Sequence, residues 1–315
     1  MANLVFKGFC RQSTSLMDQL TASIVIPTRN RPQAVERCLD ALAKQDLPPG
    51  FFEVIVVDDG SEPPLALDPA RWSSQFVLKL IHQKNTGPAG ARNRGVAEAR
   101  GQFLAFTDDD CLPAPTWLEK LVGALDANPE ALVGGSTFNG LRNDLFAETS
   151  QLVLEMVYEH FNQDPENSYF FASNNIAARR DRYLASGGFD IDFPKAGAED
   201  RDFCDRWRIR EWPLVWTASA LVEHRHAQSL CEFIRLHWRY GQGAFFYQAK
   251  RKERASGTMA EDLGFHRSLP KAVWVALSDH SLGQRLQLFS ALMLWQLANA
   301  LGFFWAAGRH LFSRR

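Results

Sequence analysis

Short apolar runs alternate with segments of helical spacing over the first third of the chain. Apolar, β-branched runs predict buried strands at residues 23–27, 52–57, 76–82 and 102–107, and apolar residues at helical spacing predict helices at 32–47 and 88–100. Near-continuous apolar strands separated by helices are typical of a parallel sheet that is covered on both faces. We therefore expect an α/β fold with a Rossmann-like, mostly parallel central sheet flanked by helices.

The order of elements becomes less regular after the fourth strand. Residues 1–20 show no clear period and are interpreted as an N-terminal arm. From about residue 230 the composition changes, which indicates a helical C-terminal region over 231–315. Between these two regions, helices are also expected at 118–125, at 145–161 and in the second part of 193–210, and strands at 131–135, 169–178, 214–216 and 220–222.

An uncharged stretch of 23 residues, 286–308, lies near the C-terminus. Its length would allow it to cross a bilayer. Lys271 and Arg285 precede it and Arg309 follows it, and positive charge on both flanks favours a helix lying in the membrane interface, or a re-entrant hairpin, over a single crossing. The alternative is an ordinary core helix of a small C-terminal subdomain.

Composition and charge narrow the class of protein. With 46% hydrophobic and 23% charged residues among 315, the chain can bury a large core. Its 35 basic and 36 acidic residues give a formal charge of -1, which argues against a nucleic-acid partner. The five scattered cysteines fit reduced thiols, and residues 1–10 lack the apolar segment of a signal peptide, so we expect a cytoplasmic protein.

Carboxylates follow two of the predicted strands at the point where each strand ends. Asp108, Asp109 and Asp110 close the fourth strand, and Asp58 and Asp59 close the second. Because the carboxyl ends of parallel strands share one edge of a sheet, both clusters are expected there, where they could bind a divalent cation and a phosphorylated ligand. Either cluster could equally be a turn whose short side chains bond the backbone or cap a helix.

Three further motifs contain groups that could take part in chemistry. Residues 85–93 form a glycine-containing loop that opens a helix, so free backbone amides could face a phosphate, although the Walker lysine and the GxGxxG order are absent. Glu199 and Asp200 begin a predicted helix, where a carboxylate is kept ionised for use as a base or as a cap. His224 and His226 follow a strand and could join carboxylates around Mn2+ or Mg2+, or be ordinary surface histidines.

Taken in order, six motifs resemble glycosyltransferase family 2. The resemblance covers roughly residues 21–240, and six motifs in the right order are far more specific than any one of them. It implies a GT-A fold over 21–230, with a nucleotide-binding half at about 21–112 and an acceptor half at about 113–230. The matching motifs are residues 23–30 (SIVIPTRN), 56–61 (VVDDGS), 85–95, 106–110 (FTDDD), 199–202 (EDRD) and His224.

The resemblance implies that the donor substrate is a nucleoside-diphosphate sugar bound by the first half. By the family's pattern, Pro27, Thr28 and Arg29 would line the pocket for the base. Asp59 would contact that base, and its neighbour Asp58 is placed in the same donor site.

The aspartate triplet is the metal site that the resemblance implies. Asp110, the last acid of the family's DxD pattern, would bind the divalent ion, Mn2+ or Mg2+, that bridges the donor diphosphate. Asp108 would approach the ribose and the metal, and whether Asp109 shares that task is open. His224 would complete the coordination of the ion, with His226 as a second candidate.

The family's Glu-Asp motif matches Glu199 and Asp200, with Asp200 as the base. In an inverting mechanism the base removes a proton from an acceptor hydroxyl while that oxygen attacks the anomeric carbon opposite the leaving nucleoside diphosphate. The resemblance therefore implies a metal-dependent inverting glycosyltransferase, which acts on a glycan or a lipid-linked acceptor.

The C-terminal region bears on where such an enzyme would work. Residues 235–243 resemble a segment that follows the catalytic domain in membrane-associated members, and Arg235 and Arg239 could contact a diphosphate or a lipid phosphate, or belong to a solvated basic helix. We expect a protein at the cytoplasmic face of a membrane. Two alternatives are a sugar-phosphate nucleotidyltransferase, which usually has a glycine-rich basic loop where this chain has Pro27 to Asn30, and a catalytically silent, membrane-associated subunit of glycan assembly.

Overall fold

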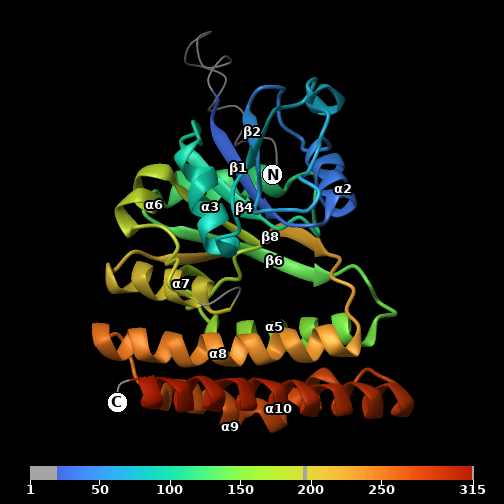
Figure 1. Ribbon diagram of the computed structural model, residues 1–315, viewed down its shortest axis with the longest axis vertical. Coiled ribbons are helices and arrows are strands. Elements are labelled where there is room, and N and C mark those ends of the chain that lie inside the picture. Colours follow the sequence, from blue (N-terminus) through green and yellow to red (C-terminus); the bar gives the residue numbers. More distant parts are fainter. Residues whose placement is uncertain (1–19, 194–196, 314–315) are drawn as a thin grey trace.

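The apolar runs form the strands of one central sheet, and the segments of helical spacing cover it (Figure 1). The computed structural model describes residues 20–193 and 197–313, so of the predicted N-terminal arm only Leu20 is included. The strands are β1 (Ala22–Thr28), β2 (Phe52–Asp58), β3 (Val77–His82), β4 (Phe103–Thr107), β5 (Cys111–Pro113), β6 (Leu132–Asn139), β7 (Asn175–Arg179) and β8 (Leu214–His224). The helices are α2 (Pro32–Leu42), α3 (Gly87–Ala97), α4 (Trp117–Ala127), α5 (Leu145–Phe161), α6 (Arg180–Ser186), α7 (Glu199–Ile209), α8 (Leu230–Arg254), α9 (Met259–Ala276) and α10 (Leu282–Ser313), with 3-10 turns at Pro69–Trp72 and Pro165–Asn167.

The strand order of the sheet is β3-β2-β1-β4-β7-β6-β8-β5. Strands β3, β2, β1 and β4 run parallel, β7 runs antiparallel to both of its neighbours, and β6 and β8 are again parallel. The parallel half contains the strands that end in the acidic clusters. The predicted α/β fold with a Rossmann-like sheet is confirmed, with antiparallel pairs confined to the second half of the sheet.

Helices cover both faces of the sheet, which explains the continuous apolar character of β1. Ile24 and Ile26 point into a core shared with α2 and α4, whereas Val25 between them points into a core shared with α3 and α7. Every residue of β1 is therefore buried, as expected for a strand with helices on both sides.

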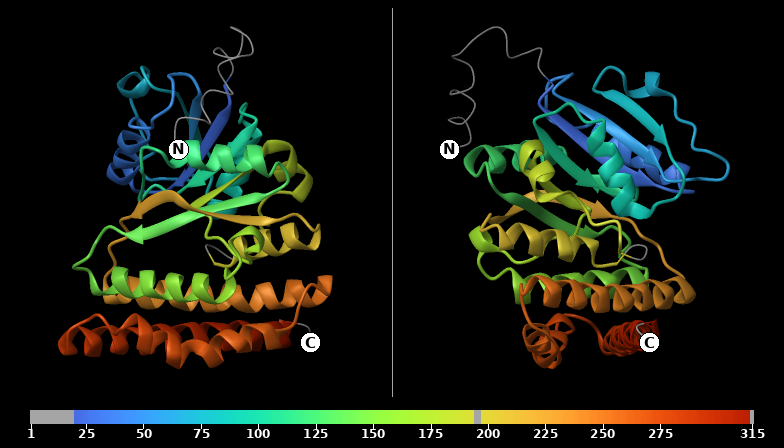
Figure 2. Two further views of the ribbon diagram at one scale, coloured as in Figure 1. Left: turned by 180° about the vertical axis from the view of Figure 1, so that it is seen from behind. Right: turned by 60° about the vertical axis from the view of Figure 1, so that its left-hand side comes forward.

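The C-terminal helices form two layers at one end of the molecule (Figures 1 and 2). Helices α5 and α8 lie next to the sheet, and α9 and α10 lie beneath them as an outer layer. Helix α10 runs along α8, and the close contact depends on glycines, because a Cβ added at Gly241 or Gly302 would clash with backbone atoms of the facing helix. Within the described residues, α10 alone is long and apolar enough to cross a membrane, with a mean hydropathy of 1.4 over its richest window, a property that core helices can share.

Several local predictions differ from the structure. The predicted strand at 169–178 is wrong for residues 169–174, because side chains take the backbone partners that a strand would use. The Asn162 side chain bonds the backbone of Tyr169 and Phe170, and the Tyr158 hydroxyl bonds Ala172. The two runs at 214–216 and 220–222 are one strand, β8, with an irregular register, and the short elements β5 and α6 were not predicted.

Candidate active site

The carboxyl ends of β1, β2 and β4 meet at one edge of the sheet, as their parallel register requires. Thr28 at the end of β1 lies opposite Asp58 at the end of β2, and β4 pairs with the other side of β1. A cavity of about 1460 Å³ lies at this edge. Its wall includes predicted site residues from distant parts of the chain, namely Pro27, Thr28, Arg29, Asp59, Asp108, Asp109, Asp110, Glu199, Asp200, His224 and His226.

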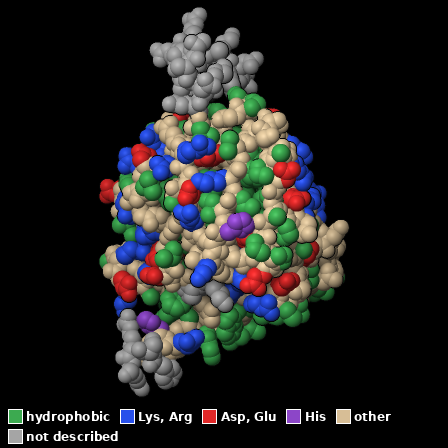
Figure 3. Space-filling model, turned by 45° about the horizontal axis from the view of Figure 1, so that its top comes forward, with side chains coloured by type: hydrophobic (Ala, Val, Ile, Leu, Met, Phe, Trp, Pro, Cys, Tyr) green, Lys and Arg blue, Asp and Glu red, His purple; other side chains and the backbone are tan. Residues whose placement is uncertain are grey.

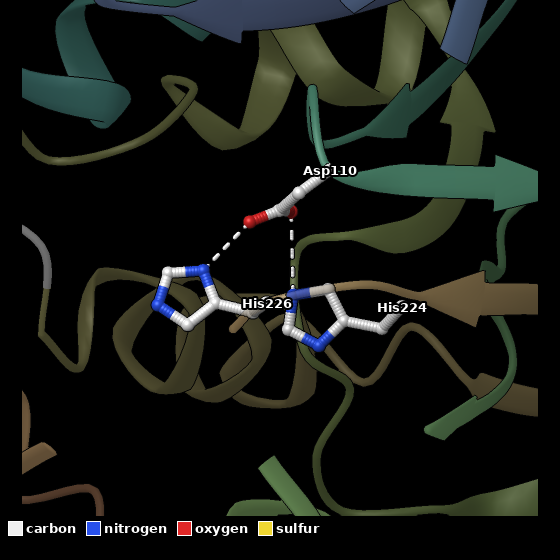
Figure 4. A group of neighbouring side chains, drawn as sticks. All are labelled: Asp110, His224 and His226. Carbon is white, nitrogen blue, oxygen red and sulfur yellow. Dashed lines mark hydrogen bonds and ion pairs between the residues drawn. The ribbon is translucent and has the colours of Figure 1, made fainter. Parts of the chain in front are cut away.

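Asp110 lies beside two histidines at the end of β8 (Figure 4). Its Oδ1 is 3.3 Å from Nε2 of His224, and its Oδ2 is 2.7 Å from Nδ1 of His226. The side-chain atoms that could bind a metal in these three residues all lie within 4.8 Å of one another. Strand β5 produces this arrangement, because its antiparallel pairing with β8 sets Cys111 opposite His224 and bonds Arg225 N to the Asp110 carbonyl.

The cluster of Asp110, His224 and His226 has the chemistry of a cation site. Burial by itself raises the pKa of Asp110, but hydrogen bonds to His224 and His226 outweigh it and hold that pKa well below its ordinary value. An ionised carboxylate with two imidazoles is a mixed oxygen and nitrogen donor set. Such a set fits an ion of intermediate softness such as Mn2+ better than Mg2+, which prefers oxygen ligands.

Asp109 points toward β1. Its carboxylate accepts hydrogen bonds from Thr28 Oγ1 at 2.6 Å and from Arg31 at 3.0 Å, and Arg31 also lies 2.6 Å from Asp110 Oδ2. Burial raises the pKa of Asp109 to about 6. Arg31 therefore supplies positive charge to two adjacent buried carboxylates, which would otherwise repel each other in a site of low dielectric constant.

Asp108 is joined to the start of α7 through a buried arginine. Arg92 of α3 is 3% exposed, donates to Asp108 Oδ1 at 2.7 Å and lies 3.5 Å from Glu199 Oε1. Its guanidinium also lies over the ring of Phe189, 5.4 Å from the ring centroid. This one side chain thus connects the carboxyl end of β4 with the start of α7.

Glu199 and Asp200 begin α7 and have different surroundings. Glu199 is buried and accepts a hydrogen bond from the backbone of Gly197 at 2.7 Å. Asp200 is half-buried, faces the cavity, and accepts from the backbone of Arg201 at 2.8 Å, its one hydrogen bond within the described chain. Burial and the neighbouring Glu199 raise the pKa of Asp200 to about 7, so its ionised form can accept a proton near neutral pH.

Asp59 organises the loop that follows β3. Its Oδ1 accepts from the backbone of Thr86 and its Oδ2 from the backbone of Gly87, both at 2.8 Å. The expectation of free amides in the loop at 85–93 is therefore wrong for Thr86 and Gly87, whose amides donate to Asp59. Asp59 itself stays at the cavity wall near Arg29, whose Nε donates to the Gly60 carbonyl.

Asp58 is not brought to the cavity. It is 1% exposed, and its carboxylate accepts hydrogen bonds from Ser61 and from the backbone of Leu65 and pairs with His82 Nδ1 at 3.0 Å. These contacts stabilise the turn after β2. The geometry gives no support to a donor contact by Asp58 and explains the residue as an anchor for the turn that carries Asp59.

Two arginines of the site were not singled out by the sequence analysis. Arg31 and Arg92 pair with carboxylates that are 16 to 107 positions away along the chain, so local sequence does not reveal these pairs, although Arg92 lies within the motif at 85–95. Arg92 did leave one signal, because it lies with Ala89 and Val96 on the buried face of α3. A charged residue at an apolar position of a helix indicates a buried ion pair.

Comparison with known proteins is consistent with this arrangement. Residues 23–185 match the model of the family described as Glycosyl transferase family 2. The chain is 31% identical over 228 residues to the Pre-mycofactocin glycosyltransferase of Mycobacterium tuberculosis. The aligned region covers 70% of this chain and 46% of that protein. It is 34% identical over 116 residues to Glycosyltransferase AglE of Haloferax volcanii, which covers 36% of this chain and 38% of that protein.

The chain therefore spans less than half the length of these two relatives. Among solved structures, the mannosyltransferase PcManGT from Pyrobaculum calidifontis, in complex with GDP-Man and Mn2+, superposes with a TM-score of 0.59 at 20% identity. That superposition covers 98% of this chain and 93% of the other, and it supports the GT-A fold. Because the family model matches more than half of its length, and because its strands and acidic motifs follow the expected order, the chain belongs to glycosyl transferase family 2.

Proposed function

We propose that the protein transfers a sugar from a nucleoside-diphosphate sugar to an acceptor hydroxyl, with inversion at the anomeric carbon and with the help of a divalent cation. One observation carries the proposal: a single cavity is lined both by Asp110, His224 and His226 and by Asp200. The first group can hold a cation at a diphosphate, and the second can accept a proton at neutral pH. A displacement reaction needs both, whereas a binding module needs neither.

Donor binding is assigned to the edge formed by β1, β2 and β4. Pro27, Thr28 and Arg29 with Asp59 would surround the base, since they line one wall of the cavity, and Asp108 lies next along that wall. PcManGT, which shares the fold, was solved with GDP-Man and Mn2+, and this supports the same use of the edge by analogy of fold alone.

The cation would be Mn2+ or Mg2+, held by Asp110, His224 and His226, with Asp108 and Asp109 adding negative charge nearby. When bound, it neutralises the charge that develops on the departing diphosphate. Arg31 also pairs with Asp109 and Asp110, so its positive charge offsets part of the negative charge of the aspartate triplet.

Asp200 is assigned as the base. Its carboxylate takes the proton of the acceptor hydroxyl, whose oxygen forms a bond to the anomeric carbon. The bond between that carbon and the diphosphate oxygen breaks, and its electron pair leaves with the nucleoside diphosphate. Glu199 was placed among the catalytic residues by the sequence analysis, but its contacts with Gly197 and Arg92 favour a positioning role.

The division of labour along the chain follows the same assignment. Residues 21–112 would bind the donor, residues 113–230 would present the acceptor, and residues 231–315 would meet a membrane at its cytoplasmic face. The acceptor would be a glycan or a lipid-linked molecule. Support for the last step comes from α10, whose outward face is apolar along its length.

A panel of nucleotide sugars with Mn2+ or Mg2+ tests the proposal without knowledge of the acceptor. We expect one donor to raise the melting temperature only when the cation is present, because a ligand that binds the folded state stabilises it, and to be hydrolysed slowly. Asp110→Ala should lose the cation-dependent shift. A flat response to every donor would favour the silent subunit, and formation of a nucleoside triphosphate from donor and pyrophosphate would indicate a nucleotidyltransferase.

A further inference from the structure

Helix α10 presents an apolar stripe to its surroundings on the side that faces away from α8. Its members are each 49% to 70% exposed and recur every three or four residues, so they lie on one face of the helix. A solvated helix would carry polar residues on such a face. The stripe comprises Leu286, Phe289, Met293, Leu297, Leu301 and Phe304.

Helix α9 lies beside α10 in the same outer layer (Figure 2) and contributes exposed basic residues to that layer. Its exposed residues Leu263, Arg267, Lys271 and Trp274 lie three or four positions apart, and Trp274 is 78% exposed. Aromatic and aliphatic side chains mixed with lysine and arginine are typical of a surface that meets lipid head groups.

Charge is distributed unequally between this layer and the rest of the chain. Residues 259–315 contain six basic and three acidic residues, whereas the whole chain carries a formal charge of -1. The remaining residues, 1–258, are thus net acidic. Figure 3 shows the surface over the sheet, where positive and negative side chains are interspersed. Hydrophobic side chains gather at the lower edge of this view.

The cavity of the candidate active site extends into these helices. From Asp200 its wall continues along α5, α8, α9 and α10, where apolar side chains are mixed with polar ones such as Arg239 and Gln296, in contrast to the acidic end at the sheet. The apolar side chains of this part of the cavity, here called the apolar arm, include Val157, Phe161, Ala244, Phe265, Ala300 and Phe303.

The apolar arm reaches the outward face between α9 and α10. Met259, Leu263 and Phe304 line the cavity and are also 51%, 47% and 70% exposed, so they belong to both surfaces. His266 Nδ1 and Gln296 Nε2, 3.0 Å apart, join the two helices next to this place.

We propose that the outward face of α9 and α10 rests on an anionic lipid bilayer and that the acceptor is a membrane lipid. Its hydroxyl-bearing head group reaches Asp200, and its hydrocarbon chain lies in the apolar arm and leaves between α9 and α10. The inference rests on the proposed function for the role of Asp200. It explains why the acidic end of the cavity continues into a part that carries apolar side chains and opens at the exposed residues Met259, Leu263 and Phe304, which a sugar acceptor free in water would not require.

A bilayer fits this face better than a second copy of the chain does. In a symmetric dimer the same patch meets itself, so Arg267 and Lys271 of both copies would be gathered in one interface. An anionic surface attracts these residues instead, and it accepts the whole length of the apolar stripe without matching side chains.

The first experiment measures flotation of the full chain with vesicles of phosphatidylcholine containing about 30% phosphatidylglycerol, and with vesicles of phosphatidylcholine alone. We expect flotation with the anionic vesicles, weakened when salt is raised from about 0.1 M to 0.5 M, because screening reduces attraction to the head groups. Leu297→Glu and Lys271→Glu should each reduce it. Lys120→Glu, the same charge change on exposed α4, should not.

The second experiment tests the apolar arm with an NBD-labelled monoacylglycerol, which has a hydroxyl-bearing head group and one chain. We expect saturable binding that Leu263→Trp weakens by about tenfold or more, because the new ring fills space that several methylenes would occupy. Val275→Trp places the same ring on α9 away from the cavity wall and should bind the probe like the wild type.

Two results would overturn the inference: a wild-type protein that stays unbound with both vesicles, or equal probe binding by Leu263→Trp and the wild type. A concentration-dependent dimer that Leu297→Glu makes monomeric would assign the face to a second copy and equally overturn it. Donor hydrolysis by the wild-type protein in vesicle-free buffer reports on the proposed function separately. Hydrolysis without lipid binding rejects this inference alone, and lipid binding without hydrolysis rejects the proposed function.

Discussion

Two carboxyl groups of one cavity differ in acidity because their neighbours differ. Asp110 meets two imidazoles and Arg31, and its pKa lies well below the ordinary value despite burial. Asp200 lies half-buried beside Glu199, and its pKa rises to about 7. A carboxylate that binds a metal must stay ionised, whereas a carboxylate that acts as a base needs a pKa near the working pH. The residue environments therefore separate the two roles that we assign.

Replacing the base should remove transfer without removing the donor. In Asp200→Asn the amide cannot accept the proton, so we expect transfer to fall by about 10²- to 10⁴-fold, the usual contribution of a general base. The donor dissociation constant, measured by calorimetry with Mn2+, should stay within about twofold, since the proposed donor contacts lie elsewhere. Asp192→Asn, the same change at an exposed site, serves as the control, and near-wild-type transfer by Asp200→Asn would reject the assignment.

The raised pKa of Asp200 predicts the pH dependence of transfer. Its folded-state pKa of about 7 lies above the ordinary value, so the carboxyl is protonated below pH 7 and cannot act as a base. We expect kcat/KM to rise about tenfold per pH unit below 7 and to level off above it. The residual rate of Asp200→Asn should lack this step. A wild-type profile that is flat between pH 5.5 and 8.5 would contradict the assignment.

His226 should matter for cation binding as much as His224 does. Both imidazoles contact Asp110, and loss of one ligand should weaken binding of Mn2+ by at least about tenfold. Calorimetric titration of His224→Ala and His226→Ala with Mn2+ measures this. His280→Ala, outside the cavity wall, provides the matched control. Unchanged affinity in His226→Ala would restrict the site to Asp110 and His224.

At the scale of elements, the C-terminal layer depends on how closely two helices approach. Gly302 of α10 faces the backbone of Trp238 on α8, and the space does not admit a Cβ. We therefore expect Gly302→Ala to lower the free energy of unfolding by about 1–3 kcal/mol, because the helices must move apart. Gly308→Ala on the same helix has open space around it and should leave stability equal or slightly higher, by up to about 1 kcal/mol. Urea unfolding of both variants compares them, and equal values would contradict the close contact.

Element pairing also decides where the cation cluster forms. The runs of apolar residues predicted β4 and most of β8, but the three residues of β5 are too short to show a period. Their antiparallel pairing with β8 is nevertheless what places Asp110 beside His224 and His226. Local pattern could name these residues as candidates, but it could not tell which atoms would meet.

At the scale of the whole molecule, Arg92 links the carboxyl end of β4 to the start of α7, and so connects the two halves that we propose for donor and acceptor. Its removal leaves Asp108 and Glu199 without their buried counter-charge, so Arg92→Met should lower the free energy of unfolding by about 3 kcal/mol or more. Arg94→Met, two positions away on the exposed side of α3, should change it little. Thermal or urea unfolding measures both, and equal stability of the two variants would show that Arg92 is not a bridge between the halves.

Much of the candidate site could be predicted because its motifs are contiguous in sequence. The aspartate triplet, Asp59 and the Glu199-Asp200 pair each follow a strand or begin a helix, and ends of elements can be predicted from local pattern. Arg31 and Arg92 could not be found in this way, since they act through partners from other elements. The direction of the Asp58 side chain could not be predicted either, because the sequence motif is the same whether the carboxylate faces the cavity or the turn.

The sequence by itself determined the strands of the parallel half, the acidic groups at their carboxyl ends and the family to which the chain belongs. Apolar periodicity and short motifs are local properties, so they can be recognised in the sequence without knowledge of the fold. Only the tertiary structure decided the antiparallel insertion of β7, the pairing of β5 with β8 and the loop at 169–174. It also decided that the cavity runs from the aspartates to the outer helices. These features depend on which distant segments pack together. Such packing is determined by the total free energy of the folded chain and not by any local stretch of sequence.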